Sequence, residues 1–208
     1  MKLRKLNKRR SASSWGSSPE RTGPVRIIGG DYKGRKLSAP TGRGTRPTSD
    51  RVRESLFNIL HNGMGVELEG TRVIDLFAGS GALGLEALSR GATVCTFIDR
   101  ALSAKQCIED NLTTLALTDQ GTVLKLDAAH LPPRLTNVAP VHLAFLDPPY
   151  GKGLITNALT SLQQGEWLAE RAVIVVETSQ TEDFTAPAPY IPTDQRTYGP
   201  SRISFLQI

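Results

Sequence analysis

The chain has 208 residues, of which 39% are hydrophobic and 22% charged, a composition typical of one large folded domain. It has no apolar run of about 18 residues, so the sequence predicts no membrane-spanning helix, and its charged start lacks the apolar core of a signal peptide. Two cysteines and three histidines without metal-ligand spacing give no indication of a disulfide framework or a metal site.

The net charge of +5 is distributed unevenly along the chain. Residues 1–53 contain 15 Lys and Arg against three acids, a balance of +12, whereas the remaining residues contain 10 against 17, a balance of −7. We expect residues 1–24 to form a disordered basic tail; their composition also fits a transit peptide, although no amphipathic period supports one. Cations gathered beside an acidic remainder indicate a polyanionic partner.

Two elements are predicted after this tail. Residues 25–37 have the pattern of a hairpin with a basic turn, and residues 49–60 that of a helix. The helix residues expected to face a sheet are Val52, Leu56, Ile59 and Leu60. Arg51 and Arg53 flank this apolar face and are candidates for phosphate contacts, the alternative being an ordinary solvent-exposed helix face.

A strand, a glycine turn and a helix follow, over residues 72–77, 78–81 and 82–90. The segment from Gly79 to Gly84 matches the GxGxxG pattern of dinucleotide-binding proteins. The match alone is weak, because glycines serve any tight strand-to-helix turn. The turn does predict a helix N-terminus with free backbone N–H groups and a close approach for a ligand.

Four predicted strands each carry an acid at or near the carboxyl end. The strands are 72–77, 93–98, 122–126 and 141–146, with the acids Asp75, Asp99, Asp127 and Asp147. Ligands bind at this edge of an open parallel sheet; Asp99 is well placed for ribose hydroxyls, and Asp127 with the Ala128 N–H for an adenine edge. A single acid of this kind is more often a turn former or a helix cap. Four of them beside a glycine turn favour a cofactor that contains a nucleoside.

The segment Asp147-Pro148-Pro149-Tyr150 follows the apolar run 141–146 and is the most informative motif in the chain. The prolines fix φ and donate no backbone hydrogen bond, so this segment can neither continue the strand nor begin a helix. A carboxylate, fixed carbonyl groups and an aromatic ring suit a planar base with an exocyclic NH2 group. The alternative is a plain strand-to-loop corner with Asp147 and Tyr150 in solvent.

NAD and S-adenosylmethionine (SAM) both contain adenosine, so other features must separate them. Asp75 lies within the strand that precedes the glycine turn, where it could receive the ammonium group of an amino-acid cofactor but would repel a pyrophosphate. No His or Lys is placed for hydride transfer; His61, His130 and His142 lie outside the strand-end loops, and the last two are interpreted as structural. These features favour SAM.

The remaining pattern completes an alternation of helices and strands. Helices are predicted over 101–117 and 154–164, a buried strand over 172–178 and a closing strand over 202–207. Pro187, Pro189 and Pro192 predict a loop between these two strands, and Cys95 and Cys107 are expected to be reduced packing residues. Strands that alternate with helices imply a doubly wound α/β sheet.

The motifs together resemble a known family. Residues 75–81, Asp99, Asp127 and residues 147–150, in this order and spacing, are similar to the class I SAM-dependent amino-methyltransferases. The N-terminal stretches narrow the resemblance to the RsmD family of 16S ribosomal RNA guanine-N2 methyltransferases. These stretches are residues 26–30, 33–37 and 46–60. The resemblance covers residues 25–207, including a terminal Arg196-Thr197-Tyr198-Gly199 before the last strand.

The resemblance implies a Rossmann-like class I methyltransferase fold: a mostly parallel seven-stranded sheet with one antiparallel strand, helices on both faces and an N-terminal basic β-hairpin. The predicted domains are a tail (1–24), an RNA-binding element (25–61) and a methyltransferase domain (62–208). The implied cofactor is SAM, and the implied partner is 16S rRNA in an assembling small ribosomal subunit. A cytoplasmic monomer without a metal or a membrane partner is expected.

The resemblance also assigns roles to individual residues. The catalytic candidates are Asp147, Pro148, Pro149 and Tyr150. The cofactor-binding candidates are Asp75, Phe77, Ala78, Gly79, Ser80, Gly81, Asp99, Arg100, Asp127, Ala128 and Asp147. The RNA-binding candidates are Arg26, Lys33, Arg35, Lys36, Arg46, Thr48, Arg51 and Arg53.

The predicted chemistry follows from the weak nucleophilicity of an exocyclic amine. The Asp147 carboxylate and the Pro148 carbonyl would each accept one N–H of the amine. Tyr150 would stack on the base, so the loss of activity is expected to be mild in Tyr150→Phe and severe in Tyr150→Ala. Three alternatives stay open: an adenine-N6 or cytosine-N4 amino-methyltransferase of DNA or other RNA, an NAD-dependent oxidoreductase, and a non-enzymatic RNA-binding module.

Overall fold

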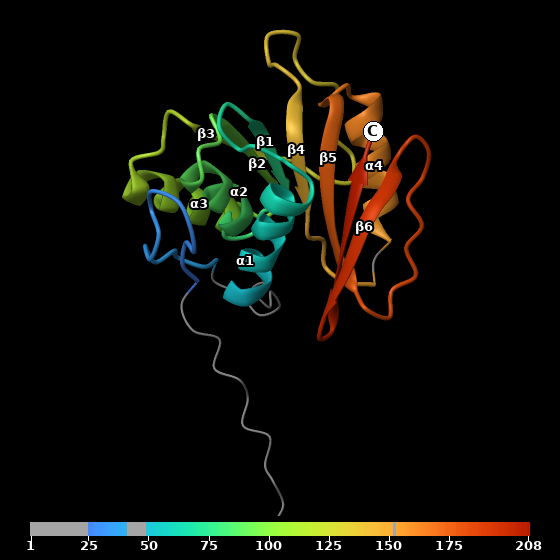
Figure 1. The fold of residues 1–208 in the computed structure, drawn as a ribbon. Coiled ribbons are helices and arrows are strands. Elements are labelled where there is room, and N and C mark those ends of the chain that lie inside the picture. The colour runs from blue at the N-terminus through green and yellow to red at the C-terminus, as the bar shows by residue number, and fades with distance from the viewer. Residues whose placement is uncertain (1–24, 41–48, 152) are drawn as a thin grey trace, which may run out of the picture.

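The computed structural model describes residues 25–40, 49–151 and 153–208, which form a seven-stranded sheet covered by helices (Figure 1). The strand order is β3-β2-β1-β4-β5-β7-β6. The strands are β1 (Arg72–Leu76), β2 (Val94–Asp99), β3 (Gly121–Lys125), β4 (Val141–Leu146), β5 (Leu168–Ser179), β6 (Ile191–Tyr198) and β7 (Ser201–Gln207). The helices are α1 (Asp50–Asn58), α2 (Ala82–Ser89), α3 (Leu102–Leu115) and α4 (Leu154–Gln164), and α1 continues into a π-helical turn, η1 (Ile59–Gly63).

Strands β1 to β5 pair in parallel, and β7 alone runs against its neighbours β5 and β6. This arrangement confirms the predicted fold class, a mostly parallel seven-stranded sheet with one antiparallel strand. The carboxyl ends of β1 to β5 therefore share one edge of the sheet, which lies at the bottom of Figure 1. None of the helices in the described part of the chain is long and apolar enough to cross a membrane.

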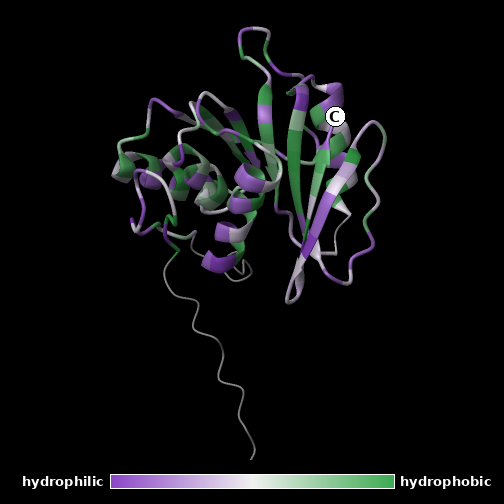
Figure 2. Ribbon diagram, in the orientation of Figure 1, coloured by the Kyte–Doolittle hydropathy of each residue, from purple (hydrophilic) through white to green (hydrophobic). Residues whose placement is uncertain are grey.

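Strand β6 is the element that sequence reasoning missed. Pro192 was expected in a loop, but it lies in this strand, which forms one edge of the sheet and is exposed along most of its length. Figure 2 shows that β6 is largely hydrophilic, so it lacks the apolar alternation that marks a half-buried strand. An edge strand tolerates proline because the backbone on its outer side needs no partner.

Successive side chains of the central strands enter two separate hydrophobic layers, one on each face of the sheet. Val73 of β1 packs in the layer covered by α1, α2 and α3, whereas Ile74 packs in the layer covered by α4. Both strand residues are at most 1% exposed. Since both faces are covered, the strands of the sheet centre are continuous apolar runs, as expected for a parallel sheet.

Helix α1 packs against the sheet centre. It begins after Ser49, whose hydroxyl accepts the Val52 N–H at 3.4 Å. Leu56 and Leu60 are buried as predicted, and so is Phe57, which was not predicted and whose ring centroid lies 5.7 Å from that of Phe145 on β4. This contact fixes α1 above the strand that leads to the Asp-Pro-Pro-Tyr segment.

The N-terminal segment folds back on itself as a short hairpin-like loop. Arg26 and Lys36 form an antiparallel bridge, supported by backbone hydrogen bonds from Ile27 N–H to the Arg35 carbonyl and from Leu37 N–H to the Val25 carbonyl. Val25, Ile27 and Leu37 lie in the same hydrophobic layer as α1 and α2. The loop is therefore packed on the body of the protein, with its charged side chains outward.

Candidate active site

The carboxyl edge of the sheet brings together the segments singled out by sequence. Leu76 pairs with both Ile98 and Leu146, so the next residue along each of these two segments, Asp99 and Asp147, lies beside Phe77. We call the region of residues 77–81 with Asp75, Asp99 and Asp127 the turn side. The region of residues 147–150 with the strand ends of β5 and β7 is called the tetrapeptide side.

The turn between β1 and α2 is held in an unusual backbone conformation. Phe77, Gly79 and Gly81 have φ angles of 60°, 56° and 75°. A bulky residue at positive φ is strained, and such strain persists where surrounding contacts impose it. Here the Gly79 N–H donates to Asp99 Oδ2 at 3.0 Å, and the other oxygen of Asp99 accepts the Ala101 N–H at 2.8 Å. Asp99 thus joins the glycine turn to the start of α3.

The carboxylate of Asp75 has a different position from the one predicted. It is 2% exposed, and its Oδ2 accepts the Gly84 N–H at 2.9 Å, so it caps the first turn of α2 from below. Burial raises the pKa of Asp75 to about 8. The predicted direct contact with an ammonium group is therefore corrected: Asp75 shapes the turn and lies beneath it.

Gly84 explains why α2 can approach the sheet so closely. A Cβ atom at this position would lie 2.3 Å from Phe97 Cε1 and 2.6 Å from Cys95 Sγ, both on β2. The last glycine of the GxGxxG pattern is thus required by helix–strand packing. Its role here is in packing, and the pattern by itself does not select a cofactor.

Asp127 and its neighbours occupy the loop after β3. Its carboxylate accepts the Ala129 N–H at 3.0 Å and shares a 2.9 Å hydrogen bond with His130 Nδ1, and these bonds, the one with His130 above all, lower the pKa of Asp127. Ala128 is buried, whereas Arg100 at the end of β2 is exposed and interacts electrostatically with Asp127. The predicted structural role of His130 agrees with this contact.

The tetrapeptide side combines a buried corner with an exposed ring. Asp147 is partly buried, Pro148 is buried, and Tyr150 is 45% exposed. The Tyr150 hydroxyl donates to Glu177 Oε1 at 2.9 Å and lies 2.9 Å from Ser201 Oγ. Burial raises the pKa of Tyr150 to about 12, so the hydroxyl stays protonated at neutral pH.

Sequence reasoning missed Glu177. It is 7% exposed and follows Val176, which pairs with Leu146, so Glu177 lies at the same level of the sheet as Asp147. The signal was present in the sequence, because the apolar run Val173–Val176 ends in this acid just as residues 141–146 end in Asp147. A fifth strand-end acid therefore belongs to the carboxyl edge.

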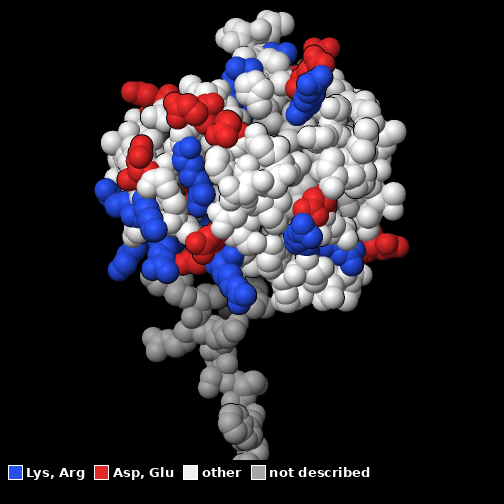
Figure 3. Space-filling model, in the orientation of Figure 1, with Lys and Arg blue, Asp and Glu red and all other residues white. Residues whose placement is uncertain are grey.

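The predicted RNA-binding residues divide into three groups. Arg26, Lys33, Arg35, Lys36 and Arg51 are exposed, and we call them the basic surface. Figure 3 shows blue side chains gathered at the lower left, over the N-terminal loop and α1 of Figure 1. Arg46 and Thr48 lie outside the described residues.

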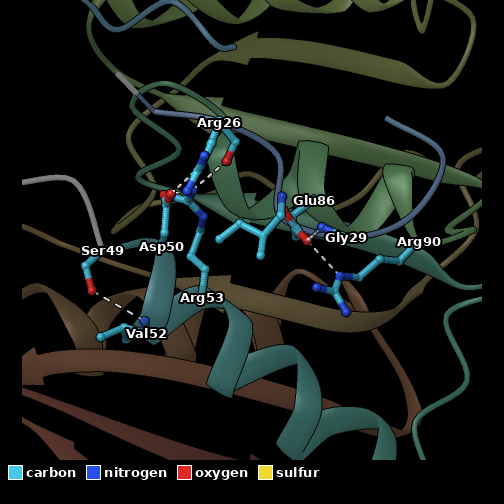
Figure 4. Close-up of polar contacts among 9 residues, drawn as sticks. Arg26, Gly29, Ser49, Asp50, Val52, Arg53, Glu86 and Arg90 are labelled. Atoms are coloured by element: carbon cyan, nitrogen blue, oxygen red, sulfur yellow. Dashed lines mark hydrogen bonds and ion pairs between the residues drawn. The ribbon is translucent and has the colours of Figure 1, made fainter. Parts of the chain in front are cut away.

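Arg53 alone forms the third group, and the prediction that it contacts RNA was wrong. The side chain is 1% exposed; its guanidinium donates to the Arg26 carbonyl at 2.6 Å and to Asp50 Oδ1 at 3.0 Å (Figure 4). Burial lowers the pKa of Arg53, although Asp50 opposes this effect. Arg53 therefore ties α1 to the N-terminal loop.

A second buried charge fixes the same loop to α2. The carboxylate of Glu86 is fully buried and accepts the N–H groups of Ile28 and Gly29 at 2.7 and 2.8 Å (Figure 4). Arg90 donates to Glu86 at 2.7 Å and lies 4.7 Å from the ring centre of Phe57. The basic surface is thus held on the helix that begins at the glycine turn.

Asn111 links the N-terminal loop directly to the turn side. It is 2% exposed; its amide donates to the carbonyls of Ser38 and Ser80 at 3.1 and 3.0 Å and accepts the Ser38 N–H at 2.8 Å. Ser80 is part of the glycine turn, so this one side chain connects the end of the N-terminal loop to the predicted cofactor site.

The other residues considered from sequence are structural. His142 lies in β4 and contacts Arg72, and burial lowers its pKa. Cys95 and Cys107 are free and buried, as predicted, and burial raises the pKa of both thiols. Among the described residues, no group of three or more His, Cys, Asp or Glu side chains could hold a metal ion.

The strand order and the glycine turn define a class I methyltransferase fold of the Rossmann-like type. The solved structure of the Escherichia coli protein yhhF is similar, with a TM-score of 0.73 and 36% identity, over 89% of this chain and 98% of that one. Residues 25–207 match the model of the family described as "Conserved hypothetical protein 95". The chain belongs to this family, the RsmD family.

Two curated relatives extend the comparison. "Ribosomal RNA small subunit methyltransferase D" of E. coli strain K12 is 41% identical over 168 residues, which cover 81% of each chain. YlbH of Bacillus subtilis is 40% identical over 177 residues, which cover 84% of this chain and 94% of that one. Both alignments span most of the family's length.

Proposed function

We propose that this protein is a SAM-dependent methyltransferase that modifies the exocyclic N2 amine of a guanine in small-subunit ribosomal RNA, on an assembling subunit. The observation that carries the proposal is the position of Asp147. The register of β1 with β4 sets residue 147 beside residue 77, at the start of the glycine turn, which supports a site there where an acceptor amine and a cofactor methyl group can meet. Family membership supports methyl transfer, and the name of the E. coli relative supports ribosomal RNA as the substrate.

The turn side fits a cofactor that contains adenosine. Asp99 is partly exposed, and each of its oxygens accepts one backbone N–H, which leaves lone pairs for ribose hydroxyls. The space beside Gly79 is open, because a Cβ there would meet its nearest described atom only at 3.9 Å. Asp99, Gly79, Ser80 and the loop at Asp127 would hold SAM, which supplies a methyl group on a positively charged sulfur.

The tetrapeptide side fits an amine that must be activated by orientation. The lone pair of the guanine N2 is delocalised into the ring, so the amine is a weak nucleophile. The Asp147 carboxylate and the Pro148 carbonyl can each accept one of its N–H groups, which favours a tetrahedral nitrogen with its lone pair directed away from both oxygens. Orientation of this kind can supply much of a rate enhancement without a strong base.

Base recognition and RNA binding fall to different residues. The exposed ring of Tyr150 offers a stacking face, and stacking on an aromatic ring is worth about 1–3 kcal/mol per base. The basic surface lies over the N-terminal loop and α1 and can contact phosphates around the target. A guanine in a loop needs little extrusion to reach the site, whereas a paired one must be unstacked.

The proposal is tested with SAM labelled in its methyl group and with unmodified small subunits, free rRNA and duplex DNA as substrates. After digestion to nucleosides, label is expected in N2-methylguanosine from rRNA, with more from subunits than from free rRNA. The Asp147→Ala variant, which lacks the side-chain acceptor, serves as the inactive control. Label in N6-methyladenosine or N4-methylcytidine would instead identify one of the other amino-methyltransferases, and label in DNA alone would exclude rRNA as the substrate.

A further inference from the structure

The contacts of Tyr150 assign a role to a residue outside the known motif. Glu177 lies on β5, 27 positions from Tyr150 in sequence, yet its Oε1 accepts the Tyr150 hydroxyl at 2.9 Å. Ser201 on β7 completes the arrangement with a hydroxyl 2.9 Å from the same oxygen. Since the Tyr150 hydroxyl donates to Glu177, it accepts from Ser201, and the three groups form a directed chain.

The Tyr150 side chain is held at its far end, by its hydroxyl. The residue is 45% exposed, whereas Glu177, which anchors its hydroxyl, is 7% exposed. A hydrogen bond to a buried carboxylate is among the stronger ones, because the acceptor is charged and shielded from water. The ring is therefore restricted in rotation while its surface stays accessible, which is what a stacking platform requires.

Holding the ring before the base arrives lowers the entropy cost of stacking. A free aromatic side chain on a loop would have to be immobilised when the base binds, and that immobilisation reduces the useful binding energy. Glycine restricts the backbone less than any other residue, and Gly151 and Gly153 follow Tyr150. The anchor on β5 and β7 therefore opposes flexibility at the point where the base must be positioned.

We propose that Glu177, with Ser201, is a positioning residue that holds the Tyr150 ring in place as the wall of the base pocket beside Asp147. The proposal deepens the proposed function and rests on it. It predicts a specific defect: RNA should bind nearly as well as before, since phosphate contacts provide most of the affinity, whereas the bound base should react more slowly.

The experiment compares Tyr150→Phe, Glu177→Gln and the double variant. Under single-turnover conditions at saturating RNA, Tyr150→Phe is expected to lose about tenfold in methyl-transfer rate, the size expected for a lost hydrogen bond to a charged acceptor. Glu177→Gln, whose amide oxygen still accepts but carries no charge, is expected to lose about fivefold. RNA and SAM dissociation constants should stay within about twofold. The double variant should be no slower than Tyr150→Phe, because Tyr150→Phe removes the hydrogen bond that Glu177→Gln weakens.

The matched control is Glu182→Gln. Glu182 is a partly exposed acid that accepts the Gly151 N–H of the same loop at 3.3 Å, whereas the Tyr150 hydroxyl bonds Glu177 and Ser201. The Glu182→Gln variant should keep the wild-type rate. Thermal unfolding of all variants shows whether they are folded, and Glu177→Gln is used because it preserves the shape of the side chain.

Two results would overturn the proposal. One is a wild-type rate in Glu177→Gln. The other is a Glu177→Gln defect that is equally large in the Tyr150→Phe background, which would show that Glu177 acts independently of the ring. Failure of the proposed function would look different: the wild-type protein would then place the label in another nucleoside. The rates of the same variants could still be compared with that nucleoside as the product.

Discussion

The turn side and the tetrapeptide side of the site are stabilised by different kinds of contact. On the turn side, Asp75, Asp99 and Asp127 each accept a backbone N–H from a residue at most 20 positions away. On the tetrapeptide side, Tyr150 is held by the side chains of Glu177 and Ser201, 27 and 51 positions away. The first arrangement is a property of local chain geometry, whereas the second requires the whole sheet to be formed.

The largest effect is expected for Asp147→Ala, which tests whether the tetrapeptide side performs the chemistry alone. The variant removes one acceptor of the amine, and loss of a preorganised electrostatic contact in an active site costs about 100- to 1000-fold in rate. SAM affinity, measured by calorimetry, should change by no more than a few-fold. A variant that keeps half of its rate would show that Asp147 does not orient the amine.

Arg53→Ala tests the importance of a long-range contact at α1, the one between this helix and the N-terminal loop. The Arg53 guanidinium bonds the Arg26 carbonyl and Asp50, and the side chain is 1% exposed, so the variant loses two hydrogen bonds and leaves a cavity. It should lose about 3 kcal/mol of unfolding free energy. Arg51→Ala, two residues away and exposed, should change stability by less than about 0.5 kcal/mol. Urea unfolding measures both. Equal stability losses would contradict the distinction between the two arginines.

The basic surface should act on RNA binding without affecting the turn side. Replacing Arg35, Lys36 and Arg51 with alanine is expected to weaken RNA binding about 20-fold and to reduce the slope of log affinity against log salt by about 2 units. SAM affinity should be unchanged. The control is Arg171→Ala, an exposed arginine near the opposite edge of the sheet. An unchanged salt slope in the triple variant would show that these cations do not contact phosphates and that the basic surface is an ordinary solvent-exposed one.

Asp99→Ala is the converse test, directed at the turn side. Loss of the acceptor for the N–H groups of Gly79 and Ala101 should loosen the glycine turn and weaken SAM binding about tenfold, while RNA binding stays the same. Asp99→Asn, which keeps an acceptor oxygen, should recover part of the affinity. A parallel loss of RNA affinity would mean that the two sides are not independent.

The contrast between the two sides also explains what could be predicted from sequence. The glycine turn and the strand-end acids were recognisable, because strand, turn and helix follow one another within a short segment. The burial of Arg53 was not, because a charged residue on a helix is usually exposed and its main partner, the Arg26 carbonyl, belongs to another element. Strand β6 was missed since its exposed edge position requires no apolar pattern. The anchor of Tyr150 depends on β5 and β7, which only the folded sheet brings near.

The last effect expected is a pH dependence that arises from Asp75. Burial raises its pKa to about 8 in the folded protein, above the value of about 4 expected for the unfolded chain. Between these values the folded state binds a proton that the unfolded state lacks, so this contribution to stability is complete below about pH 4 and is lost as the pH rises through 8.

Asp75→Asn cannot titrate, and its oxygen can still accept the Gly84 N–H. Its unfolding free energy relative to wild type should therefore rise from pH 5 to pH 8, by at most about 1.4 kcal/mol per pH unit. Urea unfolding at each pH measures the difference, in which all other titrating groups cancel. Parallel stability curves would mean that Asp75 is ionised in the folded protein, and the turn side would then contain a buried negative charge able to attract a cationic cofactor.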